Sequence, residues 1–166
     1  MILQKREIKA AVLALLIAVG LCVHASQAKA GEPQDLVVAG GCFWCVEADF
    51  EKVSGVIGAV SGFTGGTSEN PTYKEVTKGD TGHFEAVKIT FDPEKVTRAA
   101  LLHLFFRSVD PTDAGGQFCD RGESYRTAIF VSDSAEKQIA EAAKSAAEKA
   151  LSQKVVTPVL PFETFY

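Results

Sequence analysis

Strand-like and helix-like patterns alternate along residues 35–159, and their order constrains the fold more than any other feature of the sequence. Short apolar or β-branched runs bounded by glycine or proline predict strands, and longer runs with apolar residues at helical spacing predict helices. The predicted strands cover 35–39, 56–63, 83–91, 125–131 and 155–159. The predicted helices cover 42–52, 97–109 and 134–153, with a short further helix before Gly79 that has Asn70 as its N-cap and Pro71 in its first position. This order is compatible with an α+β protein, namely a two-layer, ferredoxin-like split βαβ core with a mixed sheet and an additional helix and strand.

The first thirty residues predict a secretory signal peptide. A basic stretch, an almost wholly apolar run at 10–23 and an A-x-A pattern at 28–30 follow one another there. An uncleaved anchor would need about 20 apolar residues, and acylation of Cys22 would need a smaller residue than Leu21 before it. We therefore expect cleavage after Ala30, a single domain at 31–166, and a periplasmic or secreted location without stable membrane insertion.

Removal of the signal changes the net charge and the cysteine count. The whole chain has 17 basic and 21 acidic residues. Without the four basic residues and one acidic residue of the signal, 13 and 20 remain, a net charge of −7 with neutral histidines. A domain this acidic lacks the basic surface that nucleic-acid binding requires. The cysteines that remain are Cys42, Cys45 and Cys119, and an odd number in an oxidising compartment is typical of reactive thiols.

Two glycines precede Cys42 where a predicted strand is followed by a predicted helix. The N–H groups and the positive dipole end of a helix N-terminus favour a thiolate over a thiol at such a position. Cys42 and Cys45 form a C-x-x-C pair, which also occurs in zinc half-sites and in thioredoxin-like redox sites. A zinc site would need a second pair, whereas the rest of the domain offers only His83 and His103. No thioredoxin-type sequence surrounds the pair.

Five ordered motifs resemble those of the class A peptide methionine sulfoxide reductases. Gly41-Cys42-Phe43-Trp44 is similar to the family's hallmark. The second motif, similar to the family's second signature, is Gly65-Gly66 followed by Asn70-Pro71-Thr72-Tyr73-Lys74-Glu75-Val76 and then by Gly79-Asp80-Thr81-Gly82-His83-Phe84-Glu85-Ala86-Val87. The other three follow in order: Phe91-Asp92-Pro93, Asp110-Pro111-Thr112, and Asp120-Arg121-Gly122 with Tyr125-Arg126. The resemblance covers residues 35–166. It implies an oxidoreductase that reduces methionine (S)-sulfoxide, in proteins and free, without metal or cofactor and with a thioredoxin-type electron donor.

The chemistry of such a reaction requires a nucleophile and an acid. Cys42 would attack the sulfoxide sulfur while an acid protonates the oxygen. Glu85 lies on the mostly apolar face of the strand at 83–91, where burial would favour a neutral carboxyl. The resemblance gives roles to five further residues: Tyr73 and Tyr125 as neutral hydroxyl donors, Asp120 as a second active-site acid, and Phe43 and Trp44 as the wall that receives the substrate methyl group.

Attack leaves Cys42 as a sulfenic acid, which a second thiol must convert to a disulfide before a reductant restores it. Many relatives carry recycling cysteines in a C-terminal tail, whereas this sequence has none after Cys119. We expect Cys119, beside Asp120 in the Gly-rich loop at 110–122, to resolve the sulfenic acid. Cys45, three residues along the helix, is the alternative.

Two other classes of function remain open from the residues alone. A periplasmic thiol–disulfide oxidoreductase would use Cys42 and Cys45 without reducing sulfoxides. A secreted binding module would carry a degenerate site, and the complete set of site residues argues against it. We further expect His83 to be structural, His103 to be a surface or packing residue, and the protein to be a monomer.

Overall fold

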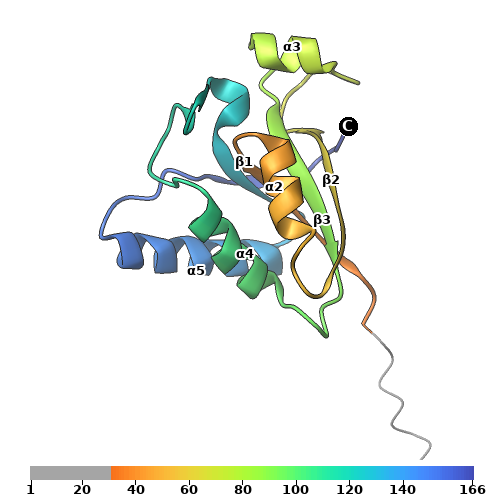
Figure 1. The fold of residues 1–166 in the computed structure, drawn as a ribbon, viewed down its shortest axis with the longest axis vertical. Coiled ribbons are helices and arrows are strands. Elements are labelled where there is room, and N and C mark those ends of the chain that lie inside the picture. The colour runs from red at the N-terminus through yellow and green to blue at the C-terminus, as the bar shows by residue number, and fades with distance from the viewer. Residues whose placement is uncertain (1–30) are drawn as a thin grey trace, which may run out of the picture. The chain divides into compact units, whose positions relative to one another are not determined.

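The computed structural model describes residues 31–166 (Figure 1), so the predicted signal peptide lies outside the described residues. No helix within this range is long and apolar enough to cross a membrane. The elements follow one another as β1 (Gln34–Gly40), α2 (Phe43–Phe50), β2 (Val56–Thr64), α3 (Tyr73–Lys78), β3 (Phe84–Phe91), α4 (Arg98–Ser108), β4 (Gly116–Gln117), β5 (Asp120–Arg121), the 3-10 helix η2 (Glu123–Tyr125), β6 (Thr127–Val131), α5 (Ser134–Leu151) and β7 (Val159–Pro161).

Five of these strands form one mixed sheet in the order β2-β3-β1-β6-β7. The pairs β2–β3, β3–β1 and β1–β6 are antiparallel, and β7 is added parallel to β6. With α2 after β1 and α4 after β3, the first four strands have the connectivity and order of a split βαβ core. The predicted fold class is therefore confirmed, with α5 and β7 as the predicted additions.

The sheet is buried on both faces. One face packs against α2, α4 and α5, and its core includes Leu36, Val38 and Ile89 from the strands. The opposite face holds Val37 and Ala39, and it is covered by the C-terminal segment at 160–165. Burial on both faces explains why β1 is a continuous apolar run instead of an alternating one. Figure 1 shows α4 and α5 side by side on the helical face.

The short helix α3 begins two residues later than predicted, so the assignment of Asn70 as N-cap and Pro71 as first helical residue is wrong. The N-cap is Thr72, whose hydroxyl accepts a hydrogen bond from the Glu75 N–H, while the Glu75 carboxylate accepts one from the Thr72 N–H. This reciprocal pair is a capping box, and it satisfies two backbone donors that Asn70 could not reach. Asn70 has a φ of 47° and lies in the turn before the helix.

The last strand also differs from its predicted range of 155–159. The N–H of Val156 donates to the carbonyl of Pro111 (2.8 Å), and the hydroxyls of Thr157 and Thr127 share a hydrogen bond (2.8 Å). These bonds connect the stretch to other parts of the chain, and strand pairing starts only at Val159. Similarly, β6 begins at Thr127 and not at Tyr125, because Tyr125 is the last residue of the 3-10 helix η2.

Candidate active site

Cys42 is the N-cap residue of α2, directly after the turn that ends β1. Its carbonyl accepts hydrogen bonds from the N–H groups of Cys45 (3.1 Å) and Val46 (3.3 Å), and its side chain is partly buried. The preceding Gly41 has a φ of 86°, which a residue with a side chain rarely adopts. A Cβ there would also lie 2.6 Å from the Cβ of Gln117. Glycine therefore lets the turn form and lets the β4–β5 hairpin pack against it.

Cys45 faces Cys42 one helical turn further along. A hydrogen bond with Cys42 is the main cause that raises the pKa of the Cys45 thiol, followed by partial burial and by the negative charges of Cys42, Asp120 and Asp49. Both cysteines line a small cavity of about 80 Å³, which the hairpin residues Phe118 and Asp120 also line. Cys45 is therefore the thiol nearest Cys42 along the helix, and its raised pKa favours the protonated form.

Glu85 is buried in the middle of the site. It lies on the helical face of β3, is 1% exposed, and accepts a hydrogen bond through Oε2 from the N–H of Phe43 (3.2 Å). Its other oxygen, Oε1, is buried without a hydrogen-bond partner among residues 31–166. Burial raises the pKa of this carboxyl, the Phe43 N–H partly opposes that rise, and the charge of Asp120 adds to it. The predicted burial of Glu85 is confirmed.

Two tyrosines lie beside this carboxyl. Tyr125 follows the hairpin, and burial, together with the nearby Glu85 and a hydrogen bond to the Tyr73 hydroxyl, raises the pKa of Tyr125 to about 12. Tyr73 reaches the same place from α3, and its ring stacks on Phe43 (centroids 6.2 Å apart) and Trp44 (5.9 Å). The Tyr125 hydroxyl therefore keeps its proton at neutral pH.

Aromatic side chains form an open wall over the first turn of α2. Phe43 is buried and Trp44 is 60% exposed, with their ring centroids 5.1 Å apart. Phe63 of β2 packs against Phe43 at 5.7 Å and pairs with Glu85 in the sheet register. Sequence reasoning did not identify Phe63, although the alternation in β2 places it on the helical face.

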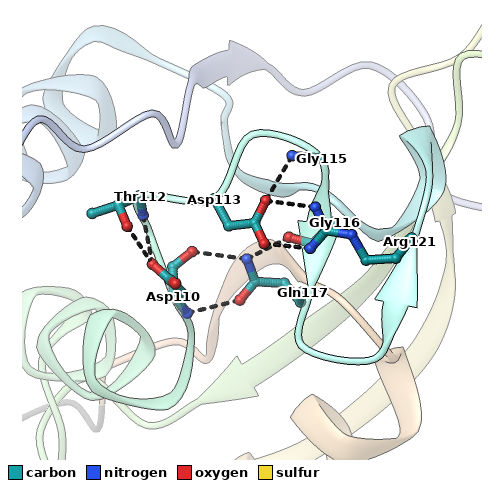
Figure 2. Close-up of polar contacts among 7 residues, drawn as sticks. All are labelled: Asp110, Thr112, Asp113, Gly115, Gly116, Gln117 and Arg121. Atoms are coloured by element: carbon teal, nitrogen blue, oxygen red, sulfur yellow. Dashed lines mark hydrogen bonds and ion pairs between the residues drawn. The ribbon is translucent and has the colours of Figure 1, made fainter.

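The predicted Gly-rich loop at 110–122 contains the short β4–β5 hairpin and a dense set of polar contacts (Figure 2). The buried amide of Gln117 accepts from the Asp110 N–H (2.7 Å) and donates to the carbonyls of Asp110 (2.8 Å) and Gly116 (2.7 Å). Asp113 forms an ion pair with Arg121 across the hairpin. No local sequence pattern indicates the role of Gln117, because a glutamine in a Gly-rich loop is usually exposed.

The hairpin carries Asp120 and Cys119 to the site in different ways. Asp120 lines the cavity beside Cys42, and its charge contributes to the raised pKa of Glu85. Cys119 is exposed in the turn between β4 and β5, next to Phe118, which is 71% exposed and has a φ of 51°. The prediction that Cys119 resolves a sulfenic acid on Cys42 stays a prediction.

The two histidines have the structural positions that were predicted. His83 is 1% exposed, and both of its ring nitrogens bond to the backbone of the preceding loop. His103 is exposed on α4. The site that remains therefore comprises a cysteine pair, a buried carboxyl, two tyrosines, a second carboxylate and an aromatic wall.

Comparison with known proteins agrees with this geometry. Residues 34–166 match the family model described as peptide methionine sulfoxide reductase. The chain is 48% identical to peptide methionine sulfoxide reductase MsrA 2 of Caulobacter vibrioides over 93% of its own length and 80% of that protein. It is 51% identical to MsrA of Bacillus subtilis, covering 77% of this chain and 73% of the relative. Among solved structures, reduced Mxr1 from Saccharomyces cerevisiae superposes with a TM-score of 0.77 at 26% identity, over 85% of this chain and 83% of the yeast protein. The chain belongs to the peptide methionine sulfoxide reductase family.

Proposed function

We propose that this protein reduces methionine (S)-sulfoxide, in proteins and free, with Cys42 as nucleophile and Glu85 as general acid. The observation that supports this most strongly is the carboxyl of Glu85. It is buried, its Oε2 is bound to the backbone N–H of the residue after Cys42, and its Oε1 has no partner among the described residues. A carboxyl with a raised pKa and one free oxygen is suited to donate a proton to a bound sulfoxide oxygen.

The reaction balances with these groups. The Cys42 thiolate attacks the sulfoxide sulfur, and the proton of Glu85 goes to the oxygen. The substrate sulfur is reduced by two electrons to methionine, and Cys42 is oxidised to a sulfenic acid that carries the oxygen. Glu85 then regains a proton from solvent.

The remaining site residues hold the substrate. Tyr125 lies near Glu85, Tyr73 lies near Tyr125, and both hydroxyls would donate hydrogen bonds to the sulfoxide oxygen. Phe43 and Trp44 offer the apolar surface for the methyl group. The negative charge of Asp120 favours the protonated form of Glu85 and so supports its role as an acid.

Resolution of the sulfenic acid requires one of the other two thiols. Cys45 lies one helical turn from Cys42 and lines the same cavity, and a C-x-x-C pair at a helix N-terminus is short enough for a disulfide. Cys119 is exposed on the hairpin whose residues Phe118 and Asp120 line the same cavity. We propose that Cys45 condenses with the sulfenic acid and releases water. Cys119 then attacks the sulfur of Cys45, frees Cys42, and presents the disulfide to the donor. Direct resolution by Cys119 is the alternative.

The proposal extends to the donor and the location. A thioredoxin-type dithiol would reduce the final disulfide, and yeast Mxr1 has also been solved in complex with Trx2. The signal-like residues 1–30 support export to the periplasm or beyond, where such a protein would repair oxidised methionine as a monomer.

A single-turnover assay tests the function. Reduced protein is mixed with one equivalent of methionine (S)-sulfoxide, and in parallel with the (R) epimer, without any external reductant. We expect one methionine per protein from the (S) epimer and none from the (R) epimer, and no product with Cys42→Ser. Reduction of insulin disulfides together with inactivity on the sulfoxide would instead favour the thiol–disulfide oxidoreductase.

A further inference from the structure

Tyr73 belongs to a long excursion, residues 65–82, that leaves the sheet at the end of β2 and returns at the start of β3. Figure 1 shows α3 projecting beyond the ends of these two strands. Tyr73 meets the site through its side chain, which stacks on Phe43 and Trp44 and lies near Tyr125. The position of Tyr73 therefore depends on how firmly the two ends of the excursion are joined.

His83 joins these two ends. The N–H of Gly66 donates to its Nδ1 (3.2 Å), and its Nε2 lies 2.8 Å from the carbonyl oxygen of Ser68. A backbone N–H can only donate and a carbonyl can only accept, so Nδ1 is the acceptor and Nε2 carries the hydrogen. The ring is thus a neutral imidazole that bonds to two residues on the outgoing side of the excursion.

The surroundings of the ring reinforce this junction. The N–H of Thr67 donates to the carbonyl of Thr81 (3.3 Å), and the N–H of His83 donates to the Thr81 hydroxyl (3.3 Å). The His83 ring packs so closely on Gly66 that a Cβ there would lie 2.5 Å from it. Tyr166 covers the ring edge-on, with centroids 5.8 Å apart.

We propose that His83 is a positioning residue for sulfoxide reduction, which fixes the excursion at 65–82 and through it the place of Tyr73 beside Glu85. This inference rests on the proposed role of Tyr73. Both ring nitrogens are occupied by backbone groups, so His83 has no nitrogen free to exchange a proton with substrate. Its contribution is geometric, and a small misplacement of a group that binds the reacting oxygen lowers the rate substantially.

A double-mutant cycle tests this role. His83→Leu removes both hydrogen bonds, and we expect it to lower the single-turnover rate about tenfold. In a Tyr73→Ala background, the same substitution should lower the rate by less than about twofold, because there is no tyrosine left to misplace. An equal loss in both backgrounds would show that His83 does not act through Tyr73 and would overturn the proposal. Ile89→Val, a buried change on β3, the strand that directly follows His83, is the control and should leave the rate unchanged.

Two further measurements separate failure of this inference from failure of the proposed function. Trp44 is the only tryptophan of the chain and stacks on Tyr73, so its fluorescence reports the position of Tyr73 without any turnover. If Tyr73→Ala alone leaves the rate unchanged, the proposed role of Tyr73 fails, and Trp44 emission still decides whether His83 holds the excursion. If His83→Leu does not fold, His83→Asn is the second variant, because it retains an acceptor for the Gly66 N–H but loses the bond from Nε2 to the Ser68 carbonyl. We expect an altered Trp44 emission and a reduced single-turnover rate in His83→Asn, and wild-type emission with a wild-type rate would overturn the proposal.

Discussion

Glu85 combines two features that oppose each other at the scale of a single residue. Burial disfavours its charged form, whereas the hydrogen bond from the Phe43 N–H favours it. Burial dominates, and the negative charge of Asp120 acts in the same direction. The bond to Phe43 therefore serves to orient the carboxyl, leaving Oε1 free for a substrate oxygen.

Glu85→Gln should slow the reduction step by about 10²-fold or more, the usual contribution of a positioned general acid. Because the pKa of Glu85 is raised, the carboxyl stays protonated to higher pH than an ordinary glutamate. The wild-type rate should be present below that pKa and lost as the pH rises through it, and this alkaline decline should be absent in Glu85→Gln. Single-turnover rates across pH measure both effects. Glu51→Gln on the helix surface is the control, and a loss below threefold at Glu85 would transfer the acid role to Tyr73, Tyr125 or Asp120.

The two remaining thiols should separate in turnover experiments. In Cys119→Ser, release of one methionine should persist, a Cys42–Cys45 disulfide should accumulate, and turnover with a thioredoxin-type donor should collapse. In Cys45→Ser, the sulfenic acid on Cys42 should persist longer, and trapping with a sulfenic-acid reagent measures it. Peptide mapping by mass spectrometry identifies each disulfide. Unchanged recycling in Cys45→Ser, with a Cys42–Cys119 peptide recovered, would show that Cys119 resolves the sulfenic acid directly.

The β4–β5 hairpin is the element that most affects the open side of the site. Its ion pair between Asp113 and Arg121 lowers the pKa of Asp113 to about 2, mainly through the hydrogen bond from Arg121 and also through the Gly115 N–H. Since the folded pKa is lowered, this pair stabilises the hairpin above the ordinary pKa of an aspartate. The contribution is lost only as the pH falls towards about 2.

Asp113→Asn should loosen this hairpin without touching the reduction chemistry. We expect donor-dependent turnover to fall several-fold, because the turn with Cys119 is no longer held beside the cavity, while single-turnover release stays within about twofold. Asp92→Asn is a matched control. Asp92 also forms an exposed ion pair, with Lys95, and it follows the end of β3 that is far from Glu85. Equal turnover of Asp113→Asn and the wild type would show that the hairpin position does not limit recycling.

Elements with a strong periodic pattern could be predicted from the sequence, and elements fixed by particular polar contacts could not. The apolar run of β1 and the alternation in β3 depend on burial alone. The alternation predicted Glu85 on the mostly apolar face of its strand, and in the structure that face packs against the helices. The start of α3 depends on Thr72 and Glu75, whose spacing is that of a capping box and could have been recognised. The hairpin depends on Gln117, whose three hydrogen bonds join residues that no local pattern connects.

At the scale of the whole molecule, the C-terminal segment connects the second face of the sheet to the site. Phe162 and Phe165 pack on that face, and Tyr166 pairs with Phe63 through two backbone hydrogen bonds of 2.9 and 3.0 Å. Phe63 in turn packs on Phe43, and Tyr166 covers His83. The same segment therefore closes the apolar face and supports both the aromatic wall and the base of the excursion that carries Tyr73.

Export of the chain remains to be tested, and cleavage of the signal would change the N-terminus of the described domain. We expect cleavage after Ala30, so that the mature protein begins at Gly31. The N–H of Gly31 already donates to the Glu94 carboxylate (3.1 Å), and cleavage would turn this donor into a charged ammonium group that pairs with Glu94.

N-terminal sequencing of secreted protein should read Gly-Glu-Pro. Ala28→Leu should block cleavage, because the A-x-A pattern needs a small residue there, whereas Ala28→Gly should preserve it. Retention of Met1, or a lipid on Cys22, would contradict the predicted export route.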